Sequence, residues 1–386
     1  MGGRFDAVVV GGGVVGLSTA WRLAGRGLRV AVADPAPGSG ASHAAAGMLA
    51  PVSEVSYTEE PLLRLGLDSL ARWPAFAAEL SDESGLGLDL RRDGTLDVAF
   101  GADDLALLGE LGAFMEKLGL RVERLTGREC RRIEPMLAPS VRGGLLAPED
   151  SWVDPRRVVR ALLAALDGRG VPVLRERAAE LTAAGDRAAG VRLADGRTLA
   201  AEHVVLATGA WAGPGGVTRG GLAGVPPGVL PPVRPVKGQI MRLRSPEPLL
   251  GHCVRGTVHG SPVYLVPRGD GELVLGATQE ELAFDTRVTA GGLWELLRDA
   301  RELVPGITEL EVAETIAGLR PGTPDNLPLI GRTALPGLLL AAGHHRGGVL
   351  LAPLTAETVA GLVAGDGPAL PSCSPTRFEN VEETAP

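Results

Sequence analysis

The hydrophobic pattern of the first 34 residues predicts a strand, a helix and a second strand. Residues 5–10 (FDAVVV) form a β-branched apolar run, typical of a strand that is buried on both faces. Helical spacing follows from Leu17 to about Gly25, and residues 28–33 (LRVAVA) predict the next strand. The chain therefore opens with a strand–helix–strand unit, after which residues 38–43 are expected to form a loop.

Further along, helical and strand patterns enclose a stretch without long helices. Between residues 233 and 278, short apolar runs separated by turn residues indicate an antiparallel sheet. Asp154 is a suitable N-cap for a helix that has Pro155 at its first position. Helices are expected over residues 61–80, 105–118, 155–166, 293–303 and 349–363.

Glycines after the first predicted strand form a dinucleotide-binding pattern. Gly11, Gly13 and Gly16 have the fingerprint spacing between a strand and a helix, and Asp34 ends the second strand. Gly11 permits the tight turn, Gly13 lets a pyrophosphate approach the backbone, and Gly16 lets helix and strand pack closely. The helix N-terminus favours phosphate charge, and Asp34 can accept hydrogen bonds from ribose hydroxyls. A glycine-rich turn without a ligand is the alternative, and the flanking elements argue against it.

Two further segments bear on which dinucleotide binds. A nicotinamide dehydrogenase would continue the doubly wound sheet after Asp34, whereas this chain continues into the small residues 44–51 (AAAGMLAP). Such residues suit a segment lying against a flat ring, although an ordinary buried loop would have the same composition. Residues 343–353 (GHHRGGVLLAP) form a second strand–loop–helix junction, whose N–H groups could stabilise negative charge on a reduced flavin. Together they favour FAD over NAD.

These patterns predict an α/β fold with two domains interleaved in sequence. A Rossmann-type FAD-binding domain is expected over residues 1–86, 150–220 and 313–386. An α+β substrate domain with an antiparallel sheet is expected over residues 87–149 and 221–312.

Arg320, in the turn-rich segment 318–325 (GLRPGTPD), is a candidate substrate anchor. Fixed before a proline, its fork could bind a carboxylate through a charge-assisted pair that contributes about 1.5–3 kcal/mol. Arginine is abundant in this chain, so a surface role is the alternative.

Composition and charge exclude several other classes of function. The net charge of −8 argues against a nucleic-acid partner, and no run of basic residues could anchor the chain to a membrane. Apolar stretches are too short for a membrane span, and the N-terminus, already used for a strand, leaves no room for a signal peptide. The cysteines at positions 130, 253 and 373 form no metal-ligand cluster. A cytoplasmic protein without a metal is expected.

Four segments, in this order, resemble the D-amino-acid oxidase superfamily of FAD-dependent oxidoreductases, and more specifically the glycine oxidases of thiamine biosynthesis. They are VVGGGVVG at 9–16, ASHAAAGMLAP at 41–51, GLRPGT at 318–323 and GHHRGGVLLAP at 343–353. The resemblance spans nearly the whole chain, and its second and fourth segments are the specific ones. It implies noncovalent FAD and oxidation of glycine, with sarcosine and small D-amino acids as further substrates, to the imine and glyoxylate. Dioxygen would become hydrogen peroxide, and the product would supply thiazole synthesis.

The resemblance also assigns cofactor contacts. Val14 and Val15 match positions at the FAD phosphate, and Asp34 with Pro35 match positions at the adenosine ribose. Family members usually have Glu where this chain has the shorter Asp34. The remaining matches lie around the phosphates and the flavin ring and, for Ala179, at the adenine: Ala41, Ser42, Ala46, Gly47, Met48, Ala179, His344, His345, Arg346, Gly347, Gly348, Val349 and Leu350.

Three residues match substrate-binding positions of the family. Arg320 matches the arginine that binds the carboxylate, Tyr264 a tyrosine whose hydroxyl helps to hold it, and Arg346 a second substrate-contacting arginine. The chain departs from the family at Pro262, where His can occur, and at Gln279, where Met can occur. Both positions lie near the substrate in the family, so the preferred amine is less defined than the chemistry.

Three other functions compete with this assignment: a sarcosine or other N-methyl amino-acid oxidase, a D-amino-acid dehydrogenase and a non-catalytic flavin-binding sensor. Many sarcosine oxidases attach FAD to a cysteine near the C-terminal loop, and residues 343–348 contain none. Hydride transfer needs no general base, and loop histidines such as His344 and His345 more often serve packing or hydrogen bonding. The implied partners are a small amine and dioxygen. A homotetramer and transfer of the product to thiazole synthase rest on the resemblance alone.

Overall fold

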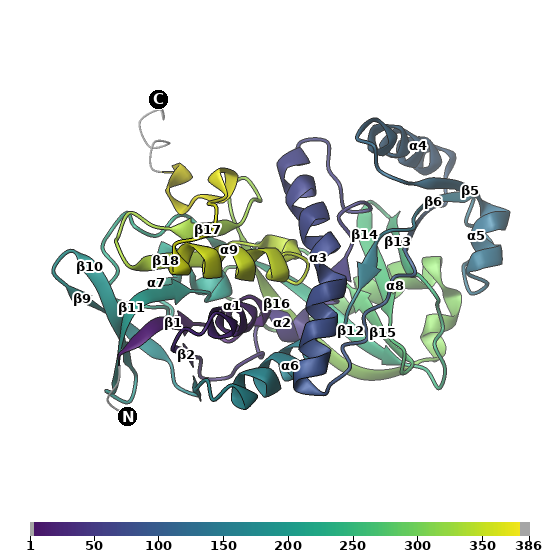
Figure 1. Cartoon of the computed structure of the whole chain (residues 1–386). Helices are drawn as coiled ribbons and strands as arrows, with labels where there is room; N and C mark the ends of the chain where they lie inside the picture. Colours follow the sequence, from purple (N-terminus) through teal and green to yellow (C-terminus); the bar gives the residue numbers. More distant parts are fainter. Residues whose placement is uncertain (1–3, 379–386) are drawn as a thin grey trace.

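Two eight-stranded sheets, each assembled from separate stretches of the chain, form the framework of the protein (Figure 1). The computed structural model describes residues 4–378. The first sheet has the order β17–β18–β11–β1–β2–β8, its central strands are parallel, and the β9–β10 hairpin joins it at β11. Its strands are β1 (Phe5–Val10), β2 (Val30–Ala33), β8 (Val173–Leu174), β9 (Ala178–Ala184), β10 (Arg187–Leu193), β11 (Thr198–Leu206), β17 (Leu329–Arg332) and β18 (Leu338–Ala342).

Both faces of the first sheet are buried, which explains its continuous apolar runs. In β1, Ala7 and Val9 belong to the core beneath the helices, whereas Val8 and Val10 belong to the core beneath the β9–β10 hairpin. Four helices pack against one another on the first of these faces (Figure 1): α1 (Val14–Gly25), α3 (Glu60–Ser84), α6 (Pro155–Gly168) and α9 (Ala352–Ala364).

The helix boundaries agree with the sequence pattern in part. The Asp154 carboxylate accepts a hydrogen bond from the N–H of Arg156 at 2.8 Å, which confirms the predicted N-cap of α6. Helix α9 begins at Ala352 and not at the predicted residue 349, because residues 348–351 form a turn that follows the 3₁₀ turn at 345–347. The prediction of a loop up to residue 43 was wrong at its end, where α2 (Ala41–Ala44) makes one helical turn.

The second sheet has the order β16–β12–β15–β14–β13–β4–β6–β5 and is antiparallel except where β13 meets β4. Helix α8 (Ala290–Leu303) packs on one face against side chains such as Met241 and Leu265. Helices α4 (Ala102–Lys117) and α5 (Gly127–Ile133) lie near β5 and β6 (Figure 1). The strands are β4 (Thr95–Ala99), β5 (Glu123–Thr126), β6 (Gly143–Ala147), β12 (Arg234–Arg244), β13 (Cys253–Val258), β14 (Ser261–Pro267), β15 (Glu272–Gly276) and β16 (Glu311–Gly322).

The predicted fold class is confirmed: a parallel α/β sheet and an antiparallel sheet are built from interleaved parts of the sequence. A two-stranded sheet of β3 (Met48–Leu49) and β7 (Ser151–Trp152) and the short helix α7 (Pro214–Val217) complete it. The domain boundaries stay a prediction, and β16 crosses the one placed at residue 313. Within residues 4–378, no helix has the length and apolar character needed to cross a membrane.

Candidate active site

A cavity of about 1780 Å³ is lined by residues from both sheets. This volume exceeds the roughly 300–1,000 Å³ of a pocket for one small molecule. The residues predicted from the sequence that line it are Gly11, Gly13, Val14, Val15, Asp34, Pro35, Ala41, Ser42, Ala46, Gly47, Met48, Tyr264, Arg320, His344, His345, Arg346, Gly348 and Val349. Folding therefore brings distant segments to one space, large enough for a dinucleotide together with a small substrate.

The start of α1 forms the phosphate-binding end of the cavity. Gly11 has φ of +112°, and a Cβ there would lie 2.7 Å from the carbonyl carbon of Ala207. The Val14 N–H donates to Ser42 Oγ at 2.9 Å, and the first turn of α1 contains no acidic residue. An anion at this helix start would meet N–H groups and the positive end of the helix dipole.

Asp34 lies at the end of β2 and is fixed by the backbone around it. Its Oδ2 accepts from the N–H of Gly12 at 2.6 Å, and its Oδ1 accepts from the N–H of Ala36 at 2.7 Å. Each carboxylate oxygen has a further lone pair, so Asp34 can also accept a hydrogen bond from a ribose hydroxyl. Its place in the cavity wall fits the role expected from the sequence.

Four predicted cofactor contacts are absent from the cavity lining that residues 4–378 form: Gly16, Ala179, Gly347 and Leu350. Gly16 packs against the Gly11 carbonyl. In β9, Ala178 lines the cavity, and side chains alternate along a strand, so Ala179 points to the other face. The Leu350 carbonyl accepts from Ser69 Oγ at 2.6 Å and Trp73 Nε1 at 2.9 Å, which ties this residue to α3.

The loop after β18 contributes two histidines that are neutral at ordinary pH. His344 is buried, and its Nε2 lies 2.9 Å from Thr355 Oγ1. Burial lowers the pKa of His344 to about 4. Burial and the nearby charges of Arg346 and Arg320 lower the pKa of His345 to about 4 as well. The positive charge beside this loop therefore comes from arginine.

Arg320 crosses from β16 over the neighbouring strand β12. Its guanidinium lies above Gly238, where a side chain would collide with it. Arg320 Nη1 donates to the carbonyl of Thr278 at 3.2 Å and to that of Lys237 at 3.4 Å. Among the described residues both of its hydrogen bonds leave from Nη1, so Nη2 and Nε can face a ligand in the cavity.

Tyr264 lies on β14 and faces the same cavity as Arg320. It pairs with Gly276 on β15, where a Cβ would lie 2.5 Å from the Tyr264 hydroxyl oxygen. Burial raises the pKa of Tyr264, and the nearby Arg320 charge opposes this rise. The hydroxyl therefore stays protonated and can donate to a carboxylate held by Arg320.

Charged residues continue across the sheet beside Tyr264. Asp97 on β4 pairs with Arg255 on β13, which pairs in turn with Tyr264. Arg255 Nε lies 3.3 Å from Asp97 Oδ2, and Arg255 Nη1 donates to the Ser53 carbonyl at 2.9 Å. Burial raises the pKa of Asp97, and the Arg255 charge opposes this rise. The cavity wall beyond Tyr264 is thus polar.

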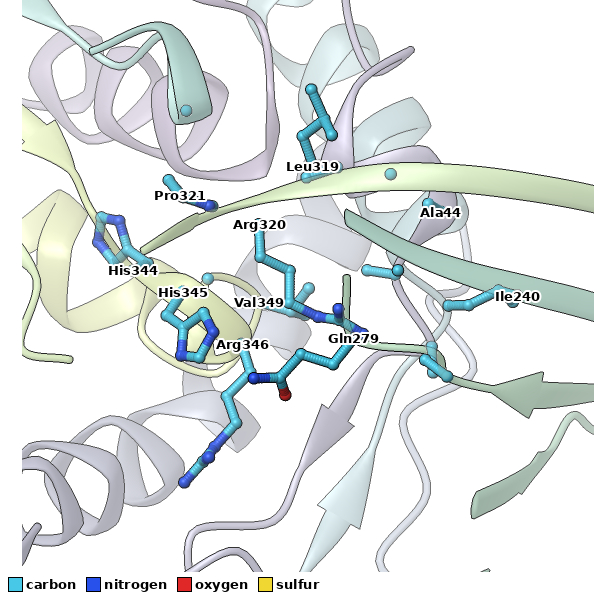
Figure 2. Close-up of a pocket in the computed structure, with 18 of the residues that line it drawn as sticks. Ala44, Ile240, Gln279, Leu319, Arg320, Pro321, His344, His345, Arg346 and Val349 are labelled. Carbon is cyan, nitrogen blue, oxygen red and sulfur yellow. The ribbon is translucent and has the colours of Figure 1, made fainter. Parts of the chain in front are cut away.

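Arg346 has a different environment from the one that the sequence suggests. Its Nη2 lies 2.9 Å from Glu59 Oε2 and donates to the Glu54 carbonyl at 3.0 Å. Figure 2 shows this side chain extending away from Arg320. The guanidinium thus ties the loop after β18 to residues 54–59, and its predicted contact with substrate remains a prediction.

Sequence reasoning missed the residues that support Arg320. Gly238 and Gly276 give room to the Arg320 and Tyr264 side chains, and Thr278 and Lys237 supply the carbonyl acceptors. These contacts join strands far apart in sequence, so no local motif could reveal them. Lys237 alone carried a signal, because it is one of two lysines in the chain.

Known proteins resemble this chain over most of its length. The family model described as FAD dependent oxidoreductase matches residues 6–362. Glycine oxidase of Geobacillus kaustophilus is 38% identical over 93% of this chain and 93% of its own. The bifunctional protein ThiO/ThiG of Trichormus variabilis is 33% identical over 99% of this chain, which spans 56% of that relative.

Solved structures show the same fold. The crystal structure of glycine oxidase from Geobacillus kaustophilus matches with a TM-score of 0.88 and 37% identity, over 97% of this chain and 99% of that one. Iminodiacetate oxidase from Chelativorans matches with a TM-score of 0.83 and 27% identity, over 94% and 96% of the two chains.

Proposed function

Because this chain belongs to the family of FAD-dependent oxidoreductases, we propose that it oxidises glycine and reduces dioxygen to hydrogen peroxide. Glycine, dioxygen and water would yield glyoxylate, ammonia and hydrogen peroxide, with the imine as the first product. Two relatives named glycine oxidase, at 38% and 32% identity, support this choice of substrate.

The residues of the cavity fit FAD, the cofactor of the family. A Cβ at Gly11 would collide with the Ala207 backbone, so the turn at the end of β1 requires glycine. Val14 and Val15, the first residues of α1, line the cavity, where the helix N-terminus favours a phosphate. Small residues of the segment 44–48 and the loop 343–349 line the part of the cavity near Arg320 and Tyr264. The start of α1 would hold the pyrophosphate, and the segment 44–48 and the loop after β18 would hold the flavin.

The observation that carries the proposal is the Arg320–Tyr264 pair in the wall of this cavity. Arg320 would hold a substrate carboxylate by a charge-assisted fork, and the Tyr264 hydroxyl would donate to the same group. Binding at two points orients the Cα–H bond, and orientation contributes much of the rate of such reactions. His344 and His345, both neutral at neutral pH, keep the adjacent wall free of a second titrating charge.

FAD held by these residues would supply the two-electron acceptor for the amine, with dioxygen as the final acceptor. The side chains that line the cavity would bind and orient the substrate. Loss of the ammonium proton to solvent would prepare the amine for oxidation, so no protein base is required.

The fate of the product and the assembly state belong to the same proposal. In the bifunctional relatives, a part similar to this chain is joined to a second part named ThiG. This arrangement supports transfer of the imine to thiazole synthase in thiamine biosynthesis. The proposal also includes a homotetramer, which rests on the resemblance to the family alone, and the cytoplasmic location expected from the sequence.

A peroxide assay over glycine, sarcosine and small D-amino acids tests the proposed function. Glycine should give the highest kcat/KM, with one peroxide formed per dioxygen consumed. A clear preference for sarcosine would favour an N-methyl amino-acid oxidase, and denatured protein that keeps its flavin would contradict noncovalent binding. Amine oxidation that needs a quinone, with negligible peroxide, would identify a dehydrogenase.

A further inference from the structure

Glu280 collects hydrogen-bond donors from three residues beside Arg320. Its Oε1 accepts from Thr278 Oγ1 at 2.6 Å and from Gln239 Nε2 at 2.8 Å. Its Oε2 forms an ion pair with Lys237 Nζ at 3.3 Å. Lys237, Gln239, Thr278 and Glu280 are called the Glu280 cluster below.

Two residues of the cluster also hold Arg320 through their carbonyl groups. Arg320 Nη1 donates to the carbonyls of Thr278 and Lys237. The Lys237 carbonyl accepts in addition from the N–H of Glu280 at 3.0 Å, and the Lys237 N–H donates to the Glu280 carbonyl at 2.9 Å. The Glu280 carboxylate therefore binds the side chains of the same two residues whose carbonyls fix the arginine.

Burial makes this arrangement sensitive to the charge of Glu280. The side chains of Lys237 and Gln239 are fully buried, and Gln239 Oε1 accepts from the Thr289 N–H at the start of α8. Burial alone would raise the pKa of Glu280, but the hydrogen bonds from Thr278, Gln239 and Lys237 lower it below the ordinary value. With a neutral residue at 280, the remaining acidic partner of Lys237 within residues 4–378 would be Asp285 at 3.9 Å.

We propose that Glu280 is a positioning residue for the substrate carboxylate, because it orders the two carbonyl groups that aim the Arg320 fork into the cavity. The inference rests on the proposed function for the identity of the substrate. The geometry applies to any small carboxylate that binds Arg320.

The test compares Glu280→Gln with Glu281→Gln in the FAD-loaded protein. Glycolate, a carboxylate without an amine to oxidise, is titrated while the absorbance of the bound flavin is followed. In E280Q, the Kd for glycolate and the KM for glycine should both rise about tenfold, with kcat and FAD content within about twofold of wild type. In E281Q both should stay at wild-type values, because Glu281 is exposed and pairs with Arg234 at 3.2 Å.

Wild-type glycolate affinity in E280Q would overturn the proposal, as would an equal loss of affinity in E281Q. If E280Q does not yield folded holoprotein, Thr278→Val removes the hydroxyl and keeps the carbonyl. This variant should also weaken glycolate binding, and an unchanged Kd would overturn the proposal. Because glycolate binding needs no oxidation, wild-type protein that binds glycolate but does not oxidise glycine would contradict the proposed function and not the role of Glu280.

Discussion

The Arg320 guanidinium lies over Gly238 on the neighbouring strand, so closely that a Cβ there would lie 2.6 Å from Arg320 Cζ. Real Cβ atoms essentially never show this distance, so the guanidinium end of Arg320 would have to shift. The absence of a side chain at Gly238 therefore gives the Arg320 guanidinium the space that it occupies.

Gly238→Ala should displace the Arg320 guanidinium and raise the KM for glycine roughly tenfold, in line with the loss of one charge-assisted hydrogen bond to the carboxylate. FAD should remain bound, because no predicted FAD contact lies on β12. Steady-state kinetics and flavin content measure the two effects. Gly87→Ala is the matched control, because Gly87 is exposed and a Cβ there meets no atom within 4 Å. A normal KM in G238A would show that Arg320 does not need this space.

Arg320→Lys should keep a positive charge but lose the planar fork and its bidentate geometry. The KM for glycine should rise by roughly tenfold to a hundredfold, in line with the loss of one or two charge-assisted hydrogen bonds. Arg64→Lys serves as control, because Arg64 is exposed and pairs only locally with Glu60 among the described residues. Equal glycine kinetics in both variants would mean that the carboxylate anchor lies elsewhere.

Tyr264→Phe removes the hydroxyl and keeps the ring that packs beside Gly276. Loss of one hydrogen bond to a charged carboxylate should raise the KM for glycine about tenfold. Thr308→Val is the control, because it removes the hydroxyl of an exposed residue that does not line the cavity, and it should behave as wild type. Steady-state kinetics would refute the role of the Tyr264 hydroxyl if Y264F matched T308V.

Ser42→Ala should weaken FAD binding about tenfold. It removes a hydroxyl of the cavity lining that accepts from the Val14 N–H and can itself donate to a phosphate, and a hydrogen bond to a charged group contributes about 1.5–3 kcal/mol. Titration of apoprotein with FAD measures the Kd. Ser84→Ala, at the end of α3, is the control, because its hydroxyl bonds locally to the Leu80 carbonyl. An unchanged Kd in S42A would show that the Ser42 hydroxyl does not contribute to FAD binding.

His344 should make the folded protein less stable in acid. Its pKa is lowered to about 4, whereas the unfolded chain takes up the proton near pH 6.5, so stability is lost as the pH falls from about 6.5 to 4. At pH 5 the loss should be about 2 kcal/mol relative to pH 7.5. His344→Gln cannot titrate, so denaturant unfolding of its holoprotein should show a smaller difference between these pH values. An equal difference would mean that His344 is not buried in its neutral form.

Local patterns were sufficient to predict β1, the Asp154 cap and the fold class, because each depends on neighbouring residues or on alternation along one strand. The prediction that Ala179 contacts the cofactor depended on which face of β9 its side chain occupies, and a shift of one residue along a strand reverses that face. The support of Arg320 could not be predicted, because it depends on the register between β12 and β16 and on a carbonyl 42 residues away.

Arg346 shows a second limit of sequence reasoning. The loop motif places it correctly beside the cavity, but the direction of its side chain depends on Glu59, which lies 287 residues away in the sequence. A long side chain can reach partners on several elements, and the packing of these elements in three dimensions determines which partner it binds.

The most direct measurement of the central claim is anaerobic titration of the purified holoprotein with glycine. One equivalent of glycine per bound FAD should bleach the flavin absorbance, and admission of dioxygen should restore the absorbance and release one equivalent of peroxide. A flavin that stays oxidised with saturating glycine would contradict glycine oxidation by this chain.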